Sequence, residues 1–455
     1  MNLQTTQPVY EPKTPLQFPK DFIWGAATSA YQIEGAIYQD GRGVSIWDEF
    51  AATVGKTYRG ESGAIAIDHY NRYKEDVALM KQLGLGAYRF SIAWPRIFPT
   101  GTGMINQKGL DFYDRLVDEL LKHNISPIPT LFHWDLPAQL GHAGGWLNRD
   151  TANYFADYVE VVSKKLGDRV SHWITVNEPW CASYLGYGVG VHAPGHTSTV
   201  EAVQSGHVLM LAHGMAAQRL RANSAASAKI GVALNLVPIY TADDSEATQK
   251  KAHERDVFFN SWFIDPIFHG KYTDDFKEVM GNFPQMQDGD LRIISTPIDF
   301  VGINYYSREY VSSQEADLTN LKRSAEYTEM GWEVFPDGIT AIIERVHAEA
   351  PNLPIMITEN GAAFDDVVDS DGLVHDIKRI NYLAKHLEAC HTAIQHSAPL
   401  IGYLVWSVFD NYEWAEGYVK RFGLVHVDLQ TQKRTIKDSG RWFADFIQNQ
   451  RNAQP

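Results

Sequence analysis

Short apolar segments alternate with longer amphipathic segments along almost the whole chain, and this alternation restricts the possible fold more than any other feature. Each apolar segment has the length of a buried strand and is followed by turn residues. Continuous apolar strands are typical of a parallel sheet that is covered on both faces. The candidate strands are residues 22–27, 87–92, 127–132, 173–176, 230–235, 300–304, 355–358 and 400–406.

The segments between these strands have helical periodicity. Residues 68–83 end at Gly84, a residue type that commonly terminates helices. Residues 108–123 carry apolar side chains at helical spacing, and segments 150–166, 200–223, 337–349 and 376–396 follow the same pattern. Strands that alternate with helices in eight units predict an α/β protein with the (β/α)8 architecture of a TIM barrel.

The chain contains no solenoid repeat and no linker rich in Gly, Ser or Pro. We therefore expect a single barrel domain over residues 1–455, with residues 1–17 as an N-terminal extension. The first residues lack an apolar stretch of signal-peptide length, and no run of about 18 apolar residues suggests a membrane span. Only Cys181 and Cys390 are present, too few for a disulfide framework. A cytoplasmic location is the expectation.

The charge balance excludes two classes of partner. The chain has 40 Lys and Arg against 55 Asp and Glu, a formal net charge of -15. A nucleic-acid-binding protein needs a basic face, and an acidic chain is not attracted to anionic lipids. A small neutral molecule is the expected partner, and the oligomeric state stays open. The 12 Trp, 22 Tyr and 21 Phe fit either a large core or a sugar site, because sugar C–H faces pack on aromatic rings.

The residues at the ends of the candidate strands carry the chemistry, because barrel enzymes bind ligands there. These positions hold His133-Trp134-Asp135, Asn177-Glu178-Pro179, Asn304-Tyr305-Tyr306, Glu359-Asn360-Gly361 and Trp406. One such transition is unremarkable, but carboxylates, amides and large aromatics together at one predicted mouth indicate a functional site. Glycoside hydrolysis needs one carboxyl group to protonate the leaving oxygen and a second, ionised one to stabilise or attack the sugar carbon. The two groups lie roughly 5–5.5 Å apart in retaining enzymes.

Two short segments, TVNEPW around Glu178 and ITENG around Glu359, resemble the glutamate motifs of glycoside hydrolase family 1. Further motifs of the family follow in order, from about residue 18 to about residue 443: FIWGAATSAYQIEG, YRFSIAWPRI, LFHWDLP, GINYYS, MGWEVFP and WSVFDNYEW. The resemblance implies a clan A barrel without a cofactor. It implies a retaining β-glucosidase that removes terminal non-reducing β-D-glucosyl residues from β-glucosides and cello-oligosaccharides through a covalent glycosyl-enzyme. Action on β-galactosides and β-fucosides, and transglycosylation, are also implied.

The resemblance assigns the catalytic roles position by position. Glu178 is expected to be the acid and then the base, and Glu359 the nucleophile. Arg89 should lie beside Glu359, where its charge favours the ionised carboxylate. Tyr306 should donate a hydrogen bond to the same carboxylate. Asn304 is expected at the catalytic centre, where it can act directly or only orient its neighbours.

A second group of residues is expected to bind the substrate. Asn177 should hold the sugar 2-hydroxyl, Trp406 should form the floor under the ring, and Trp332 should stack on the aglycone. Core packing is the alternative for the two tryptophans. The full set is Gln32, His133, Trp134, Asn177, Trp332, Trp406, Glu413, Trp414 and Phe422.

Some residues near the predicted mouth have no assigned function. His192 and Asn235 are given no role, and Gly25, Gly361 and Gly402 are expected to serve turns or close packing. The sequence has no HExxH, no P-loop and no GxGxxG after the first strand, so no metal or cofactor is expected.

Glu413 separates two classes of sugar. In the family, a glutamate here binds the outer hydroxyls of an unphosphorylated glycone, and a carboxylate would repel a 6-phosphate. Tyr418 and Lys420 keep the phosphorylated substrate open as an alternative. A catalytically silent sugar-binding barrel is a second alternative, although it would need neither Glu178 nor Glu359. The aglycone preference is expected to depend on loops that include residues 312–327.

Overall fold

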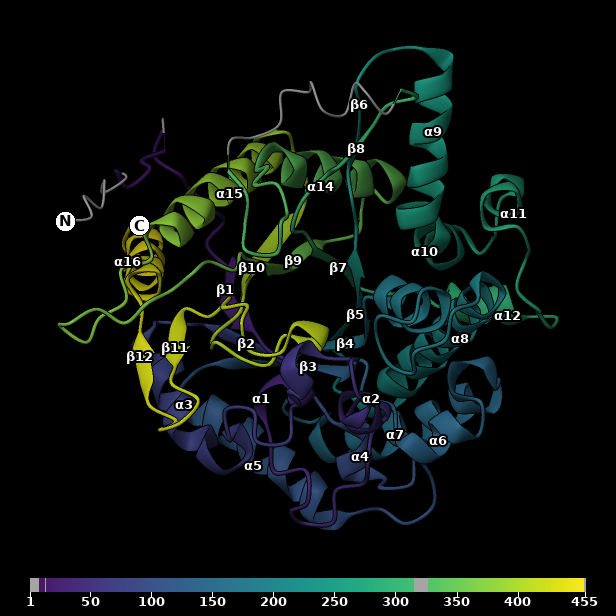
Figure 1. Ribbon diagram of the computed structural model, residues 1–455, viewed down its shortest axis with the longest axis horizontal. Coiled ribbons are helices and arrows are strands. Elements are labelled where there is room, and N and C mark those ends of the chain that lie inside the picture. Colours follow the sequence, from purple (N-terminus) through teal and green to yellow (C-terminus); the bar gives the residue numbers. More distant parts are fainter. Residues whose placement is uncertain (1–7, 13, 315–325, 454–455) are drawn as a thin grey trace.

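Eight parallel strands close into a barrel in the computed structural model, which describes residues 8–12, 14–314 and 326–453 (Figure 1). The strands pair in the cyclic order β1-β10-β9-β7-β5-β4-β3-β2. They are β1 (Ile23–Ala27), β2 (Ala87–Ser91), β3 (Ser126–Phe132), β4 (His172–Asn177), β5 (Lys229–Asn235), β7 (Phe300–Asn304), β9 (Ile355–Asn360) and β10 (Leu400–Trp406). The expected TIM barrel is confirmed.

Long helices surround the barrel (Figure 1). All six amphipathic segments form helices, and their ends differ from the expected ones by at most one residue. In α5, Leu110, Leu116 and Leu120 form part of a buried stripe, which explains why helical spacing predicted this element. The six helices are α3 (His69–Gln82), α5 (Gln107–Lys122), α7 (Asp150–Leu166), α8 (Thr199–Asn223), α14 (Asp337–Glu349) and α15 (Ile377–Gln395). A further long helix, α16 (Asp438–Asn452), was not among the expected segments.

Side chains fill the barrel interior below the carboxyl ends of the strands. One buried apolar cluster takes a residue from each of seven strands, and Ile23 of β1 packs against it. The cluster is Ala87, Ile128, Ile174, Ala233, Phe300, Met356 and Leu404. These side chains block the interior of the barrel, so a ligand can bind only at one of its ends.

Several elements were not expected from the sequence. Helix α9 (Glu246–Asp256) buries only Thr248, so its charged sequence carries no apolar stripe. The remaining elements are short: α1 (Ala30–Ile33), α2 (Ile46–Ala52), α4 (Trp94–Ile97), α6 (Ala138–His142), α10 (Trp262–Ile264), α11 (Asp274–Met280), α12 (Asp290–Ile294), β6 (Ile239–Thr241), β8 (Glu309–Val311), β11 (Val425–Val427) and β12 (Arg434–Ile436). Short elements give too few residues for a periodic signal.

Strand β9 is longer than the sequence predicts, because it continues through Glu359 to Asn360. Asn304 of β7 is the register partner of Glu359, and Val405 of β10 is the partner of Asn360. Pairing with the two neighbouring strands thus extends β9 over polar residues, which have no strand signal of their own. As a result, Glu359 is held by the sheet itself.

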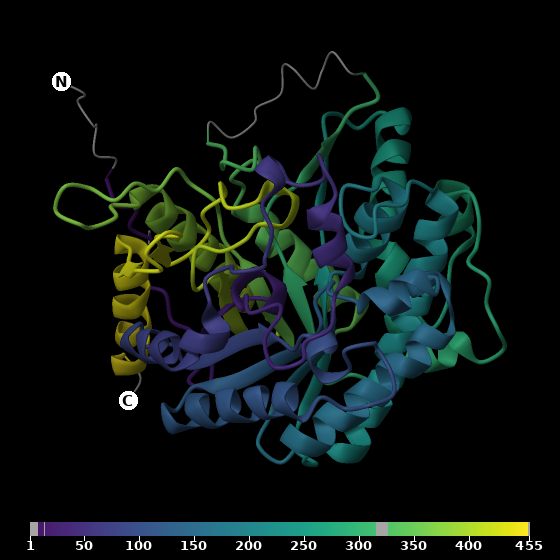
Figure 2. The same ribbon diagram turned by 60° about the horizontal axis from the view of Figure 1, so that its bottom comes forward.

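The N-terminal segment packs against the C-terminal helix. Leu16 and Phe18 are buried, and Gln450 of α16 donates to the carbonyl of Leu16 at 3.0 Å. Figures 1 and 2 place both parts on the same side of the barrel. Of the expected extension, residues 1–7 and 13 lie outside the described residues, as do residues 315–325 of the aglycone loop. No described helix combines the length and apolar character needed to cross a membrane.

Candidate active site

A cavity of about 470 Å³ lies at the carboxyl ends of the barrel strands. Small-molecule sites typically measure about 300–1,000 Å³. Residues at the ends of β3, β4, β5, β7, β9 and β10 contribute to its wall. The lining comprises His133, Trp134, Glu178, Trp180, Cys181, Leu185, Val191, His192, Asn235, Leu236, Val237, Phe259, Asn304, Tyr306, Ser307, Arg308, Glu309, Met330, Trp332, Glu359, Trp406, Glu413, Trp414, Ala415, Glu416 and Phe422.

Glu359 is held by two donors. Arg89 Nη1 lies 2.6 Å from Glu359 Oε1, and the Tyr306 hydroxyl donates to Oε2 at 2.6 Å. Arg89 is itself fixed by Thr130 Oγ1 and by the Thr358 carbonyl, both at 3.0 Å. Burial raises the pKa of Glu359, and the Arg89 charge and the Tyr306 hydrogen bond oppose that rise.

Glu178 follows β4, and its neighbours stabilise a negative charge less than those of Glu359 do. Its backbone lies in the left-handed region at φ 45°, and its N–H donates to the Ala233 carbonyl at 2.9 Å. Asn304 Nδ2 donates to Glu178 Oε1 at 2.8 Å. Burial raises the pKa of Glu178, and the negative charge of Glu359 raises it further. The site therefore pairs two buried carboxyl groups of raised pKa, of which only Glu359 has a guanidinium beside it to favour the ionised form.

Glu413 stands on another wall of the cavity. Gln32 Nε2 lies 3.3 Å from Glu413 Oε2 and also donates to Asn411 Oδ1 and the Tyr412 carbonyl. Burial, followed by the charges of Glu359 and Glu178, raises the pKa of Glu413 to about 8. The glutamine thus orients a carboxyl group that can accept hydrogen bonds from a ligand.

His133 contributes a polar edge to this wall. Its ring stacks on those of Trp406 and Trp414, with centroids 5.8 Å away in both cases. Burial, together with the charge of Arg89, holds the pKa of His133 well below its usual value, so the ring is neutral. Asn177 Nδ2 lies 3.1 Å from His133 Nε2, and among the described residues His133 Nδ1 has no hydrogen-bond partner.

Aromatic rings cover the remaining sides of the cavity. Trp332 contacts Tyr306 with ring centroids 5.1 Å apart and Phe422 at 6.3 Å. On the other side, the Trp134 ring lies 4.6 Å from that of Trp414, and its indole N–H donates to the Asn177 carbonyl at 3.0 Å. A sugar has apolar C–H faces and polar hydroxyl groups, so flat aromatic faces combined with a few directed polar groups suit it.

The structure brings the sequence-predicted residues together in two layers. Glu178, Glu359, Tyr306, Asn304, His133, Trp134, Trp332, Trp406, Glu413, Trp414 and Phe422 line the cavity. Arg89, Gln32 and Asn177 are buried behind this lining and contact it through hydrogen bonds. His192 and Asn235, which had no assigned role, also line the cavity.

Other lining residues were not predicted. Cys181 begins a π-helix (Cys181–Gly188) directly after the TVNEPW segment, and Arg308 lies two residues after Tyr306. Their closeness to motif residues was the only available signal. Of the glycines, Gly361 does serve close packing, because an added Cβ would meet the Trp406 carbonyl oxygen at 1.7 Å.

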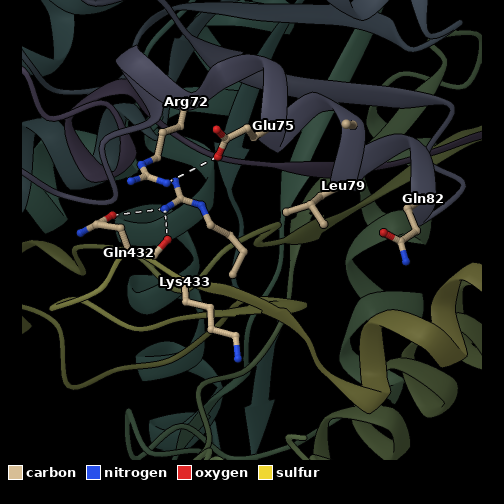
Figure 3. Close-up of a pocket in the computed structure, with 8 residues that line it drawn as sticks. Arg72, Glu75, Leu79, Gln82, Gln432 and Lys433 are labelled. Carbon is tan, nitrogen blue, oxygen red and sulfur yellow. Dashed lines mark hydrogen bonds and ion pairs between the residues drawn. The ribbon is translucent and has the colours of Figure 1, made fainter. Parts of the chain in front are cut away.

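The cavities elsewhere in the molecule include two large ones on the outside of the barrel. One, of about 490 Å³, is lined by α3 and by residues 432–434 beside β12 (Figure 3). Both of its arginines are already paired, since Arg434 Nε donates to Asp76 at 2.9 Å and Arg72 lies 3.5 Å from Glu75. The other, of about 650 Å³, is lined mainly by α14 and α15. Neither contains a sequence-predicted site residue.

One exposed group of possible metal ligands occurs within the described residues. It consists of Asp369, Asp371 and His375, whose ligand atoms lie within 4.8 Å of one another. His375 Nδ1 already bonds Asp438 at 2.6 Å, so the cluster is satisfied within the protein. The group does not line the active-site cavity.

Comparison with known proteins identifies the family. The model of glycosyl hydrolase family 1 matches residues 14–452, almost the whole chain. The chain belongs to glycosyl hydrolase family 1. Among the family's members, the 1,4-beta-D-glucan glucohydrolase of Thermotoga neapolitana is 47% identical over 438 residues, which cover 95% of this chain and 98% of that protein. The bifunctional beta-D-glucosidase/beta-D-fucosidase of Bifidobacterium breve is 43% identical over 457 residues, 94% and 98% of the two chains.

Solved structures of the family agree with this barrel. The AHE enzyme from Alicyclobacillus herbarius has a TM-score of 0.92 at 48% identity, with 98% of this chain and 99% of that chain covered. The beta-glucosidase from Thermotoga maritima in complex with glucoimidazole has a TM-score of 0.92 at 45% identity, with 96% and 99% covered. The family resemblance of the sequence motifs and the glycoside hydrolase class are therefore confirmed.

Proposed function

We propose that this chain is a retaining β-glucosidase that removes terminal β-D-glucosyl residues from β-glucosides and cello-oligosaccharides. The observation that carries the proposal is one cavity holding two buried carboxyl groups with different surroundings. Glu359 faces a guanidinium and a phenol, whereas Glu178 accepts from an amide. Such a difference suits a nucleophile paired with a proton donor.

In the first step, the Glu359 carboxylate attacks the anomeric carbon while Glu178 gives its proton to the glycosidic oxygen. The bond from the anomeric carbon to that oxygen breaks, the alcohol leaves, and a covalent glycosyl-enzyme forms at Glu359. Arg89 and Tyr306 hold the attacking carboxylate ionised and oriented. Asn304 orients the proton donor through its bond to Glu178 Oε1.

In the second step, water attacks the same carbon and Glu178 accepts its proton. The ester to Glu359 breaks, and glucose leaves with its original anomeric configuration. The negative charge of Glu359 is absent in the glycosyl-enzyme, so the pKa of Glu178 falls at the stage where it must act as a base. An alcohol or sugar in place of water gives transglycosylation by the same route.

The wall that contains Glu413 suits the glycone hydroxyls. We assign the outer hydroxyls to Glu413, Gln32 and Trp414 and a further one to the His133 edge, with Trp406 as the floor. Asn177 Nδ2 has two hydrogens, one of which goes to His133, so the other is free for the sugar 2-hydroxyl. Trp332, Trp134 and Phe422 would pack against the apolar faces of the substrate, with Trp332 on the aglycone side.

The range of accepted sugars is part of the proposal. Glucosidase and fucosidase activities are both named for the Bifidobacterium breve relative, which supports activity on β-fucosides here as well. Activity on β-galactosides is proposed from the family resemblance of the motifs. Cys181 and Cys390 are both buried free thiols, and we infer a cytoplasmic location from them.

Phosphorylated sugars fit the site poorly. Glu413 would face the phosphate, and the two residues that kept this alternative open are engaged elsewhere. The Tyr418 hydroxyl donates to the Ser62 carbonyl at 2.7 Å, and Lys420 Nζ donates to the Glu329 carbonyl at 2.5 Å. A buried carboxylate next to a phosphate would leave both charges unpaired.

Two glutamate variants test the proposal through the stereochemistry of azide products. Glu359→Gly should lose hydrolysis of p-nitrophenyl β-glucoside by at least about 10⁴-fold, and added azide should give the α-glucosyl azide. Glu178→Ala should still cleave an activated dinitrophenyl glucoside, and azide should give the β-glucosyl azide. Glu75→Gln is the control for the effect of substitution itself, because Glu75 lies on α3, away from the cavity.

The same assay separates this function from a silent sugar-binding barrel. A binding protein would release no nitrophenol from pH 5 to 8 in the unmodified chain. Full activity in Glu359→Gly, or the same azide anomer from both variants, would contradict the assigned roles.

A further inference from the structure

The Asn304 side chain is hydrogen-bonded at both ends of its amide. Nδ2 donates to Glu178 Oε1 at 2.8 Å and to Asn177 Oδ1 at 3.0 Å. On the other side, Oδ1 accepts from the Thr358 hydroxyl at 2.7 Å. Asn304 and Thr358 are 1% and 0% exposed, so the contact between them is shielded from bulk solvent. The amide can support Glu178 only while its nitrogen faces the carboxyl group.

The direction of this chain of bonds follows from Arg89. A guanidinium has donors only, and Arg89 Nη2 lies 2.5 Å from Asn177 Oδ1, which must therefore be an acceptor. The end of Asn304 that faces Asn177 must then be its NH2 group. The oxygen of Asn304 is left pointing at Thr358, whose hydroxyl has to donate.

The space that the Thr358 hydroxyl occupies is left by the missing side chain of Gly302. Gly302 lies on β7, two residues before Asn304, and an added Cβ there would meet Oγ1 and Cγ2 of Thr358 at 2.6 Å each. A side chain on Gly302 would therefore displace the Thr358 hydroxyl from Asn304. Because Gly302 has no side chain, β7 and β9 can lie close enough for the Thr358 hydroxyl to reach Asn304.

We propose that Thr358 is a positioning residue that fixes the amide of Asn304 and thereby keeps Glu178 able to act as the base of the second step. This inference rests on the proposed function of Glu178. Donation from Nδ2 favours the ionised carboxylate. Without the hydroxyl, the buried oxygen of Asn304 has no donor, so the amide is held only at its nitrogen and its hydrogen bond to Glu178 Oε1 weakens. Glu178 then becomes a weaker acid and is less available as a base.

Thr358→Val removes the hydroxyl and keeps the shape of the side chain. The alkaline limb of kcat/KM, which reports the free enzyme, should move up by about one pH unit. On a dinitrophenyl glucoside, whose slow step is the second, kcat at neutral pH should fall about tenfold. Added azide, a nucleophile that needs no base, should restore the rate. Thr358→Ser, which retains the hydroxyl, should behave like the unmodified chain in all three measurements.

Several outcomes would overturn the inference. It fails if Thr358→Val has an unchanged pH profile, or if azide does not restore its rate. It also fails if Thr358→Ser shows the same defects as Thr358→Val. Should the valine variant not fold, Thr358→Ser and Thr358→Ala give the matched pair, because both lack the methyl group and only serine can donate. If Glu178→Ala gives no β-glucosyl azide with added azide, the proposed function itself is contradicted, so the two failures are distinct.

Discussion

At the scale of single residues, two identical side chains acquire different chemistry from their neighbours. Glu359 has a guanidinium at 2.6 Å and a phenol at 2.6 Å, whereas Glu178 has an amide at 2.8 Å. Burial acts on both carboxyl groups in the same direction. The neighbours therefore determine which carboxyl group gives up its proton first.

Neutralising Glu359 should lower the pKa of Glu178. In Glu359→Gln the Coulombic contribution disappears, and we expect a fall of about one pH unit or more. The pKa should stay above that of an exposed glutamate, because burial is the larger cause and remains. A ¹³C NMR titration of labelled glutamate carboxyls, with Glu178→Gln to assign the signal, measures it. An unchanged or higher pKa would show that the two carboxyl groups do not interact.

At the scale of elements, charged side chains tie the loops after β9 and β10 to the outer helices. Lys437, at the start of α16, is 0% exposed and bonds Asp366 and Asp410, the latter at 2.7 Å. Arg379 of α15 contacts Asp366 at 2.7 Å and also pairs with Asp376. These loops follow the strands that hold Glu359 and Trp406, so the network supports the mouth of the barrel from outside.

Lys437→Met should destabilise the protein by about 3–5 kcal/mol, because it removes the fully buried cation that Asp366 and Asp410 share. Lys108→Met is the matched control. Lys108 is 73% exposed and pairs with Asp40 at 3.3 Å, so its loss should cost less than about 1 kcal/mol. Chemical denaturation of the three proteins at pH 7 measures both effects. Equal stability of the two variants would mean that the buried network contributes little.

At the scale of the whole molecule, the net charge of -15 acts on any charged substrate. Glu416 adds to this field at the wall of the cavity. A neutral glucoside is unaffected by it, whereas a doubly charged phosphate is repelled. Salt screens such repulsion, with a Debye length that falls from about 30 Å at 0.01 M to about 10 Å at 0.1 M.

Ionic strength should therefore separate the two substrate classes. Between about 0.01 and 0.3 M NaCl, kcat/KM for p-nitrophenyl β-glucoside should change less than about twofold. The much lower kcat/KM for the 6-phosphate of the same glucoside should rise with salt. A preference for the phosphate at any salt concentration would contradict the role of Glu413. A kcat/KM for the phosphate that falls with added salt would indicate a cationic site instead.

The barrel, and the set of residues that gather at its mouth, can be predicted from the sequence. Eight apolar segments and six amphipathic ones predict strands and helices because burial on one or both faces requires that periodicity. The carboxyl ends of parallel strands meet at one end of a barrel, so Glu178 and Glu359 could be paired from their positions alone. Helix α9 escaped this reasoning because it buries almost nothing.

Only the tertiary structure decided what each site residue contacts. Hydrogen bonds depend on distances of a few tenths of an ångström between strands far apart in sequence, and no local pattern encodes them. Asn304 could not be distinguished as a catalytic or an orienting residue until its amide was found between Glu178 and Thr358. The only signal for Thr358 was its place in the ITENG segment, since a threonine in a strand is ordinary. Its importance comes from the closure of the barrel, which brings β7 against β9 and leaves Gly302 as the space for its hydroxyl.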